Sequence, residues 1–188
     1  MNVDLGFASA RERRLWIWTA VVVATIYSTL GLARTLSDEL RARALLDNLF
    51  AFAFLLIGVA LVAFGFKVKA RGAEVGLVLC VVAVYLLVFA RMGIPEERTH
   101  LIEYSIVALL VYEALLERRS AGRSVPAPAL LTVLITSGLG VADECIQAAL
   151  PNRVFDPVDI GFNILAAVMA TTGRAGLLRL RQRTANGG

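Results

Sequence analysis

The sequence is poor in charged residues. Only 18% of its 188 residues are Asp, Glu, Lys or Arg, whereas 58% are apolar, and the mean hydropathy is +0.72. A typical water-soluble domain carries about 25% charged residues and fewer apolar ones. This composition excludes an ordinary soluble domain and predicts an integral membrane protein.

Residues that bind metals or act as nucleophiles are also scarce. The two cysteines, Cys80 and Cys145, lie at different depths in apolar runs, so we expect no disulfide and interpret both as buried thiols that serve as small apolar side chains. A single histidine, His100, leaves little to hold a haem or a zinc ion. No spacing of nucleophile and base and no glycine-rich phosphate loop occurs. We therefore expect no cofactor and no metal, and the pattern names no catalytic residue.

Long apolar runs dominate the chain, and each has roughly the 17–25 residues that a membrane-spanning helix needs. The six predicted spans are Leu15–Ala33, Leu49–Phe66, Ala73–Ala90, Pro95–Leu116, Pro128–Ala149 and Pro157–Gly173. A signal peptide is the alternative for the first, but that run exceeds the usual apolar region of about 7–15 residues. The predicted fold class is all-α: one polytopic helical bundle of three hairpins, forming a single domain over residues 1–188.

Two charged segments flank these runs. Arg34–Asn48 carries leucines and alanines at helical spacing among its charges, which predicts a short amphipathic helix on the membrane surface, with Ser37 as its cap. A solvated linker is the alternative. The basic residues after Gly173 are predicted to form a frayed amphipathic tail.

The basic residues predict the orientation. If the six runs alternate in direction, 13 of the 19 Lys and Arg lie on the side of the two termini and 6 on the other, which also carries most of the acids. Basic loops stay in the cytoplasm, so we expect both termini there. Glu113 lies near the cytoplasmic arginines and is predicted to be their structural ion partner.

In the last three runs, the ends that face away from the predicted cytoplasmic side carry polar side chains in helical register. These candidate binding residues are His100, Glu103, Tyr104, Glu144, Gln147, Asp156, Asp159 and Asn163, with Arg153 in the last loop. An ionisable group within an apolar span costs about 2.5–3.5 kcal/mol on insertion scales, so it rarely occurs without a partner or a function. We predict that the three helices share one polar pocket with Arg153 at its mouth, where its guanidinium would hold an anionic group.

Some of these residues have structural alternatives. Asp156 precedes Pro157 and suits a helix N-cap, and Asp159 suits the first turn. Asn163 could simply tie helices together. Glu103 and Glu144 are the strongest functional candidates.

The order of these residues resembles a family signature. The matching elements are His100 with Tyr104, then Glu144-x-x-Gln147, Leu150-Pro151-Asn152-Arg153, Asp156-x-x-Asp159 and Asn163. They are similar to the signature of VanZ-like membrane proteins over about residues 96–170. Two positions depart from it. Glu97, beside Arg98, replaces a lysine, and Ala166 replaces a glycine, which puts very close helix packing there in doubt.

The resemblance implies a location and a site. It implies a multi-pass protein of the bacterial cytoplasmic (inner) membrane, and founding members are associated with low-level resistance to teicoplanin. The favoured function is binding of a cell-envelope lipid, a lipid-linked precursor or a glycopeptide antibiotic. Alternatives are an intramembrane enzyme that acts on a lipid headgroup, with Glu103 or Glu144 as general base, and an accessory subunit of a larger membrane complex. The expected partners are membrane lipids and another membrane protein; no nucleic acid is expected.

The orientation is testable with reporter fusions. Reporters placed after Asp38, Ile94 and Asn152 are expected to be extracytoplasmic, because each position falls between an outgoing and a returning span. Fusions after Gly72 and Arg123 are the cytoplasmic controls. A cytoplasmic reporter signal at Asn152 would reverse the orientation and the side that the polar residues face.

Overall fold

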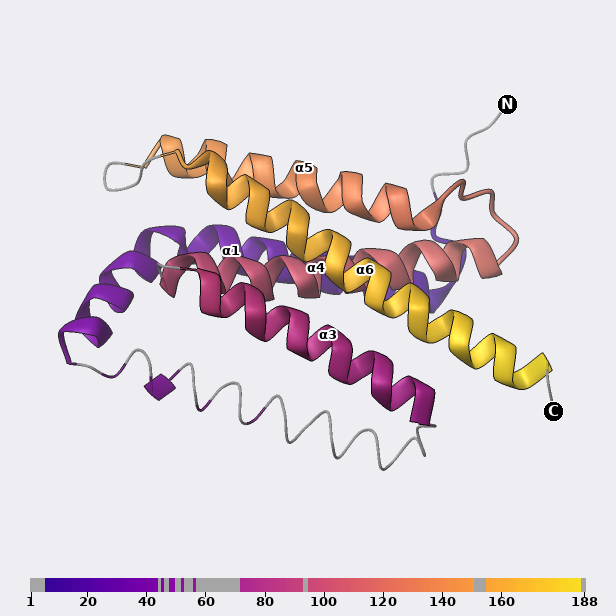
Figure 1. Cartoon of the computed structure of the whole chain (residues 1–188). Helices are drawn as coiled ribbons and strands as arrows, with labels where there is room; N and C mark the ends of the chain where they lie inside the picture. Colours follow the sequence, from indigo (N-terminus) through magenta and orange to yellow (C-terminus); the bar gives the residue numbers. More distant parts are fainter. Residues whose placement is uncertain are drawn as a thin grey trace.

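The computed structural model is all-helical, as the sequence predicts. It describes residues 6–43, 72–92, 95–150 and 155–186 and isolated positions between 45 and 56, and no strand occurs among them. The long helices are α1 (Ala10–Ala42), α3 (Gly72–Arg91), α4 (Pro95–Ser120), α5 (Pro128–Ala148) and α6 (Pro157–Asn186) (Figure 1). The predicted span Leu49–Phe66 falls largely outside the described residues.

Proline sets the start of three of these helices. Pro95, Pro128 and Pro157 are the first residues of α4, α5 and α6. Proline suits this position because the first turn of a helix leaves its N–H groups without partners within the helix.

Two predicted boundaries are wrong, because both helices continue further than expected. α1 runs without a break to Ala42, so the segment after Arg34 is not a separate helix, and Ser37 lies inside α1 rather than at a cap. No proline interrupts this segment, which lets the helix continue. α6 likewise continues to Asn186 instead of ending near Gly173.

Two glycines of α6 explain why this helix continues past its predicted end near Gly173. A side chain at Gly173 would approach Val81 of α3 to 3.2 Å, and one at Gly176 would approach Leu77 to 3.1 Å. These glycines therefore let α3 pack closely on α6, and the packing stabilises a helix that the two glycines alone would weaken.

Four helical segments are long and apolar enough to cross a membrane. They are Gly72–Arg91, Arg98–Ser120, Pro128–Ala148 and Pro157–Arg183. Large apolar side chains such as Leu79, Leu87 and Leu134 are exposed on them. Such a surface suits contact with lipid rather than water, and it indicates a membrane protein.

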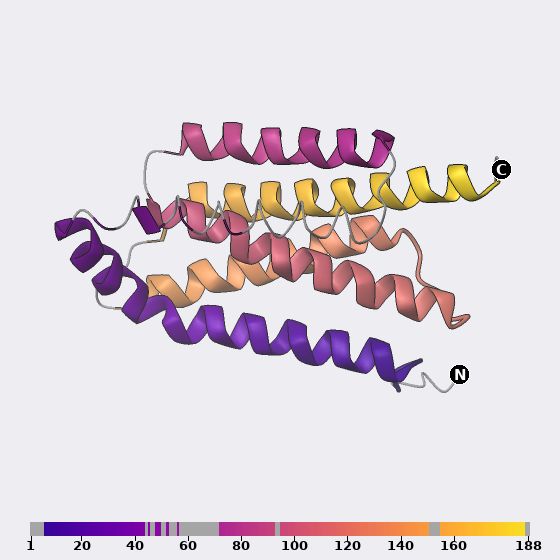
Figure 2. The same ribbon diagram turned by 90° about the horizontal axis from the view of Figure 1, so that it is seen from below.

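α4 lies at the centre of the bundle. It packs against α1, α5 and α6, while α3 packs against the outer side of α6 (Figures 1 and 2). Leu101, Val107 and Val111 of α4 are fully buried. Ala108 packs with Ala167 and Ala170, two small residues of α6, which allows the two helices to approach closely.

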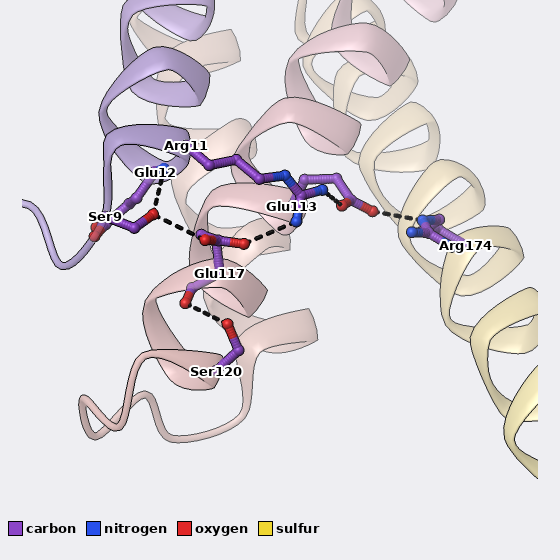
Figure 3. A network of polar contacts seen from close by, with 7 residues as sticks. All are labelled: Ser9, Arg11, Glu12, Glu113, Glu117, Ser120 and Arg174. Carbon is purple, nitrogen blue, oxygen red and sulfur yellow. Dashed lines mark hydrogen bonds and ion pairs between the residues drawn. The ribbon is translucent and has the colours of Figure 1, made fainter.

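At the end where α1 begins, an ion network joins α1, α4 and α6. It consists of Ser9, Arg11, Glu113, Glu117 and Arg174 (Figure 3). Arg11 donates to Glu117 at 2.8 Å and to Glu113 at 3.0 Å, and Arg174 donates to the other Glu113 oxygen at 2.5 Å. Glu113 is thus confirmed as a partner of the arginines.

Glu12 is joined to this network by its backbone N–H, which donates to Ser9 Oγ at 3.0 Å, and its carboxylate makes a more buried ion pair (Figure 3). Its side chain is fully buried, and Arg118 donates to it at 2.9 Å. Burial alone would raise the pKa of the Glu12 carboxyl. The hydrogen bonds from Arg118 and from the Ala8 N–H, together with the Arg118 charge, outweigh burial, so this pKa lies below its ordinary value of 4.5.

The Glu12 pair predicts a pH-dependent stability. Because the folded pKa is depressed, the pair stabilises the fold above about pH 4.5 and this contribution is lost as the pH falls through the folded pKa. We expect Glu12→Gln to lower the unfolding free energy by about 1–2 kcal/mol near neutral pH, with a smaller gap from wild type near about pH 3. Thermal unfolding in detergent measures both gaps. Glu39→Gln, in an exposed pair with Arg43, is the control and should change little. An equal gap at both pH values would contradict the assignment.

Candidate functional site

Four ionisable side chains from three helices meet at the other end of the bundle. We call His100, Asp143, Glu144 and Asp159 the helix-end cluster. His100 lies in the second turn of α4, Asp143 and Glu144 lie in the last two turns of α5, and Asp159 lies in the first turn of α6. They share one end because α4 and α6 begin where α5 finishes (Figure 1).

The imidazole of His100 lies between two carboxylates. Its Nδ1 is 3.6 Å from Oδ2 of Asp143, and its Nε2 is 3.7 Å from Oδ2 of Asp159. The exposed fractions of these three side chains are 5%, 0% and 16%, so Asp159 is the most accessible. The ring also stacks on Tyr104, with centroids 6.2 Å apart and an interplanar angle of 26°. The histidine is thus fixed on both edges and on one face.

Glu144 is held by two hydrogen bonds. Its Oε1 accepts from Nε2 of Gln147 at 2.9 Å, and its Oε2 accepts from the backbone N–H of Asp156 at 3.0 Å. Asp156 in turn caps α6, because its Oδ1 accepts from the N–H of Val158 at 2.8 Å. The carboxylate of Glu144 therefore ties the end of α5 to the start of α6 and has a fixed orientation.

Tyrosine hydroxyls extend the polar contacts below the cluster. Tyr27 of α1 donates to the carbonyl oxygen of Leu139 at 2.7 Å, and Tyr104 of α4 donates to the same oxygen at 3.3 Å. The Tyr104 hydroxyl also interacts with the Asp143 carboxylate. These contacts fix α5 against α1 and α4.

The structure brings together some of the predicted binding residues. One ligand-type atom from each of His100, Glu144 and Asp159 lies within 4.8 Å of the others. Glu103 is half-buried and is not a member of this group. Arg153 lies outside the described residues. Gln147 and Tyr104 contact members of the cluster, as described above.

Asn163 lies one turn beyond Asp159, at a very close contact between helices. A side chain added to Gly140 of α5 would meet Cβ and Nδ2 of Asn163 at 2.8 Å. The sequence had put very close packing at Ala166 in doubt. Ala166 is fully buried, and the close helix contact in the structure lies one turn away, between Asn163 and Gly140 of α5.

Sequence reasoning did not select Asp143, which faces His100. A signal for it exists in the spacing along α5. The buried residues of this helix are Pro128, Thr132, Thr136, Gly140, Asp143, Glu144 and Gln147. They recur every three or four positions and are polar or small, whereas the exposed side carries Leu130, Leu134 and Val141. This polar stripe predicts which face of a membrane helix turns inward.

The charge of the cluster restricts what it can bind. Three carboxylates surround one imidazole, so the site favours a cation or a group that donates hydrogen bonds. The predicted anionic ligand depended on the guanidinium of Arg153. None of the four cluster residues is an arginine or a lysine that could take its place. Both oxygens of Glu144 already accept hydrogen bonds. This arrangement suits a fixed binding group better than a mobile general base.

Comparison of the chain with models of known families, with curated proteins and with solved structures finds no match.

The contact at Gly140 gives a stability prediction. Gly140→Ala is expected to lower the unfolding free energy by about 1–3 kcal/mol, because the new methyl group would force α5 and α6 apart. Gly138→Ala is the matched control: nothing lies within 4 Å of the added methyl, so the change should be neutral or slightly stabilising. Thermal unfolding of both variants in detergent makes the comparison. Equal melting temperatures would show that the close contact does not carry stability.

Proposed function

We propose that this chain is a multi-pass membrane protein that binds the polar headgroup of a cell-envelope lipid through the helix-end cluster. One observation carries the proposal: an imidazole and three carboxylates converge from three apolar helices. Each ionisable group in such surroundings costs several kcal/mol without compensation. A purely structural contact between apolar helices needs only small or neutral polar residues.

We further propose the VanZ-like assignment, in the bacterial cytoplasmic membrane, with six spans and both termini in the cytoplasm. Two arrangements support it. Arg11, Arg118 and Arg174 gather at the end of the bundle opposite the cluster, as the positive-inside rule requires of a cytoplasmic end. His100 and Asp159, from separate elements of the signature, are neighbours, as expected if the motif forms one site.

The charge of the cluster favours a headgroup with an amine or several hydroxyl groups. Amino sugars of lipid-linked precursors and of glycopeptide antibiotics carry such groups, which connects this site with a role like teicoplanin resistance. Charge-assisted hydrogen bonds to carboxylates are about twice as strong as neutral ones, so an amine would gain most. Asp159 is the most exposed of the three residues around the imidazole and is the natural point of first contact.

The burial of the cluster favours a second candidate function, that of an accessory subunit. Asp143 and Glu144 are fully buried and His100 is nearly so. In this case the cluster would hold α4, α5 and α6 in the arrangement that a larger membrane complex requires.

Lipid retention distinguishes the two functions. Wild type, Asp159→Asn and Glu39→Gln are purified in mild detergent, and native mass spectrometry identifies the lipids that remain bound. We expect wild type and Glu39→Gln to retain one lipid class that Asp159→Asn loses by at least about tenfold. This is the effect of one lost charge-assisted hydrogen bond of about 1.5–3 kcal/mol.

Melting temperatures are measured on the same samples. Loss of the lipid with an unchanged lipid-free melting temperature supports headgroup binding. Equal lipid retention in all three proteins would refute it, and a lower melting temperature for Asp159→Asn in that case would favour the accessory role.

A further inference from the structure

We propose that the helix-end cluster is a binding site for a divalent transition-metal ion such as Zn²⁺, with His100 Nε2, Glu144 and Asp159 as its protein ligands. The inference shares its site with the proposed lipid binding but does not depend on it. Spacing in the sequence showed no metal motif because each ligand comes from a different helix. The tertiary structure brings the three together.

The distances between the ligand atoms fit one ion. Zn²⁺ binds nitrogen and oxygen ligands at about 2.0–2.2 Å, which places the ligands of a tetrahedral site about 3.4 Å from one another. Nε2 of His100 and Oδ2 of Asp159 are 3.7 Å apart, and the atoms of the three residues lie within 4.8 Å of one another. Small rotations of the three side chains would bring their ligand atoms to these distances around one ion.

The surroundings of the ligands match those of metal sites in proteins. A metal-bound histidine usually faces a carboxylate or a carbonyl with its second ring nitrogen, which sets its tautomer and orientation. Asp143 faces Nδ1 of His100 in this way, at 3.6 Å. Ligating carboxylates are also held by hydrogen bonds, and Glu144 accepts from Gln147 and from the Asp156 N–H.

Asn163 is an independent indication of a ligand. Its side chain is fully buried, and among the described residues neither amide atom has a hydrogen-bond partner. Side chains lean toward the N-terminus of their helix, so Asn163 leans toward Asp159, and Asp143 and Glu144 lean toward the level of Gly140. The amide lies beside Gly140, within one turn of the cluster on both α5 and α6, where a metal-bound water would satisfy it.

The ligand types decide the class of metal. One imidazole and two carboxylates suit Zn²⁺ or Mn²⁺, whereas Ca²⁺ and Mg²⁺ prefer oxygen ligands alone and Cu⁺ prefers sulfur. Three protein ligands leave a coordination position open. An oxygen of a lipid headgroup could occupy that position.

Metal binding is measured on the purified full-length chain in detergent without added lipid. Cys80 and Cys145 are exposed, so the prediction that both are buried is wrong. Both are therefore replaced by serine throughout to remove adventitious zinc binding. The protein is stripped with a chelator, titrated with Zn²⁺ by calorimetry, and assayed for metal content after desalting. We expect one Zn²⁺ per chain.

Four variants test the assignment. His100→Gln and Asp159→Asn remove ligands and should abolish the one-to-one binding. Asp143→Asn removes only the partner of Nδ1 and should weaken the affinity by about 10–100-fold. Glu39→Gln removes an exposed carboxylate elsewhere and should bind as wild type does.

Melting temperatures distinguish a variant that has lost the metal site from one that is misfolded. Zn²⁺ should raise the melting temperature of wild type but not of His100→Gln, whereas their metal-free unfolding remains cooperative. The inference is overturned if wild type binds no more Zn²⁺ than His100→Gln does. If wild type retains a lipid but does not bind Zn²⁺, the metal site is refuted and the lipid function is not. If it binds Zn²⁺ but retains no lipid, the lipid function is refuted and the metal site is not.

Discussion

The structure depends on one constraint: the polar face of α5 must be turned away from lipid. Hydrocarbon offers no hydrogen bonds, so Asp143, Glu144 and Gln147 are stable only where other helices provide partners. This requirement fixes the rotation of α5 about its axis, with Leu130 and Leu134 facing outward. α4 and α6 must then present their own polar residues to the same face, which fixes their rotation as well.

The two ends of the bundle use charge differently. At one end, Arg11 and Arg174 neutralise Glu113 in a partly exposed network that joins three helices. At the other end, carboxylates outnumber the cationic groups of the cluster, and the side chains are mostly buried. The first arrangement is complete in itself and needs no ligand. In the second, three of the four cluster residues are acidic and the fourth is a histidine, in a place where charge is costly, which favours a bound cation or hydrogen-bond donor.

The same geometry argues against a general-base role for Glu144. A general base must reach a proton of the substrate, and Glu144 already accepts two hydrogen bonds that hold it against Gln147 and the start of α6. Glu103, the other candidate base, lies outside the group of three potential ligands. A rigid, buried set of ligands instead suits a binding site that is organised before its ligand arrives.

The sequence by itself determined the all-helical fold, the helix starts at Pro95, Pro128 and Pro157, and the role of Glu113, because composition, proline geometry and charge placement act locally. It also indicated which ends of the helices carry polar groups. Only the tertiary structure decided that Asp143 faces His100, that Gly140 lies against Asn163, and that Gly173 and Gly176 extend α6 by packing on α3. Those contacts join residues far apart in the chain. They depend on how each helix is rotated against its neighbours, which no spacing within a single helix specifies.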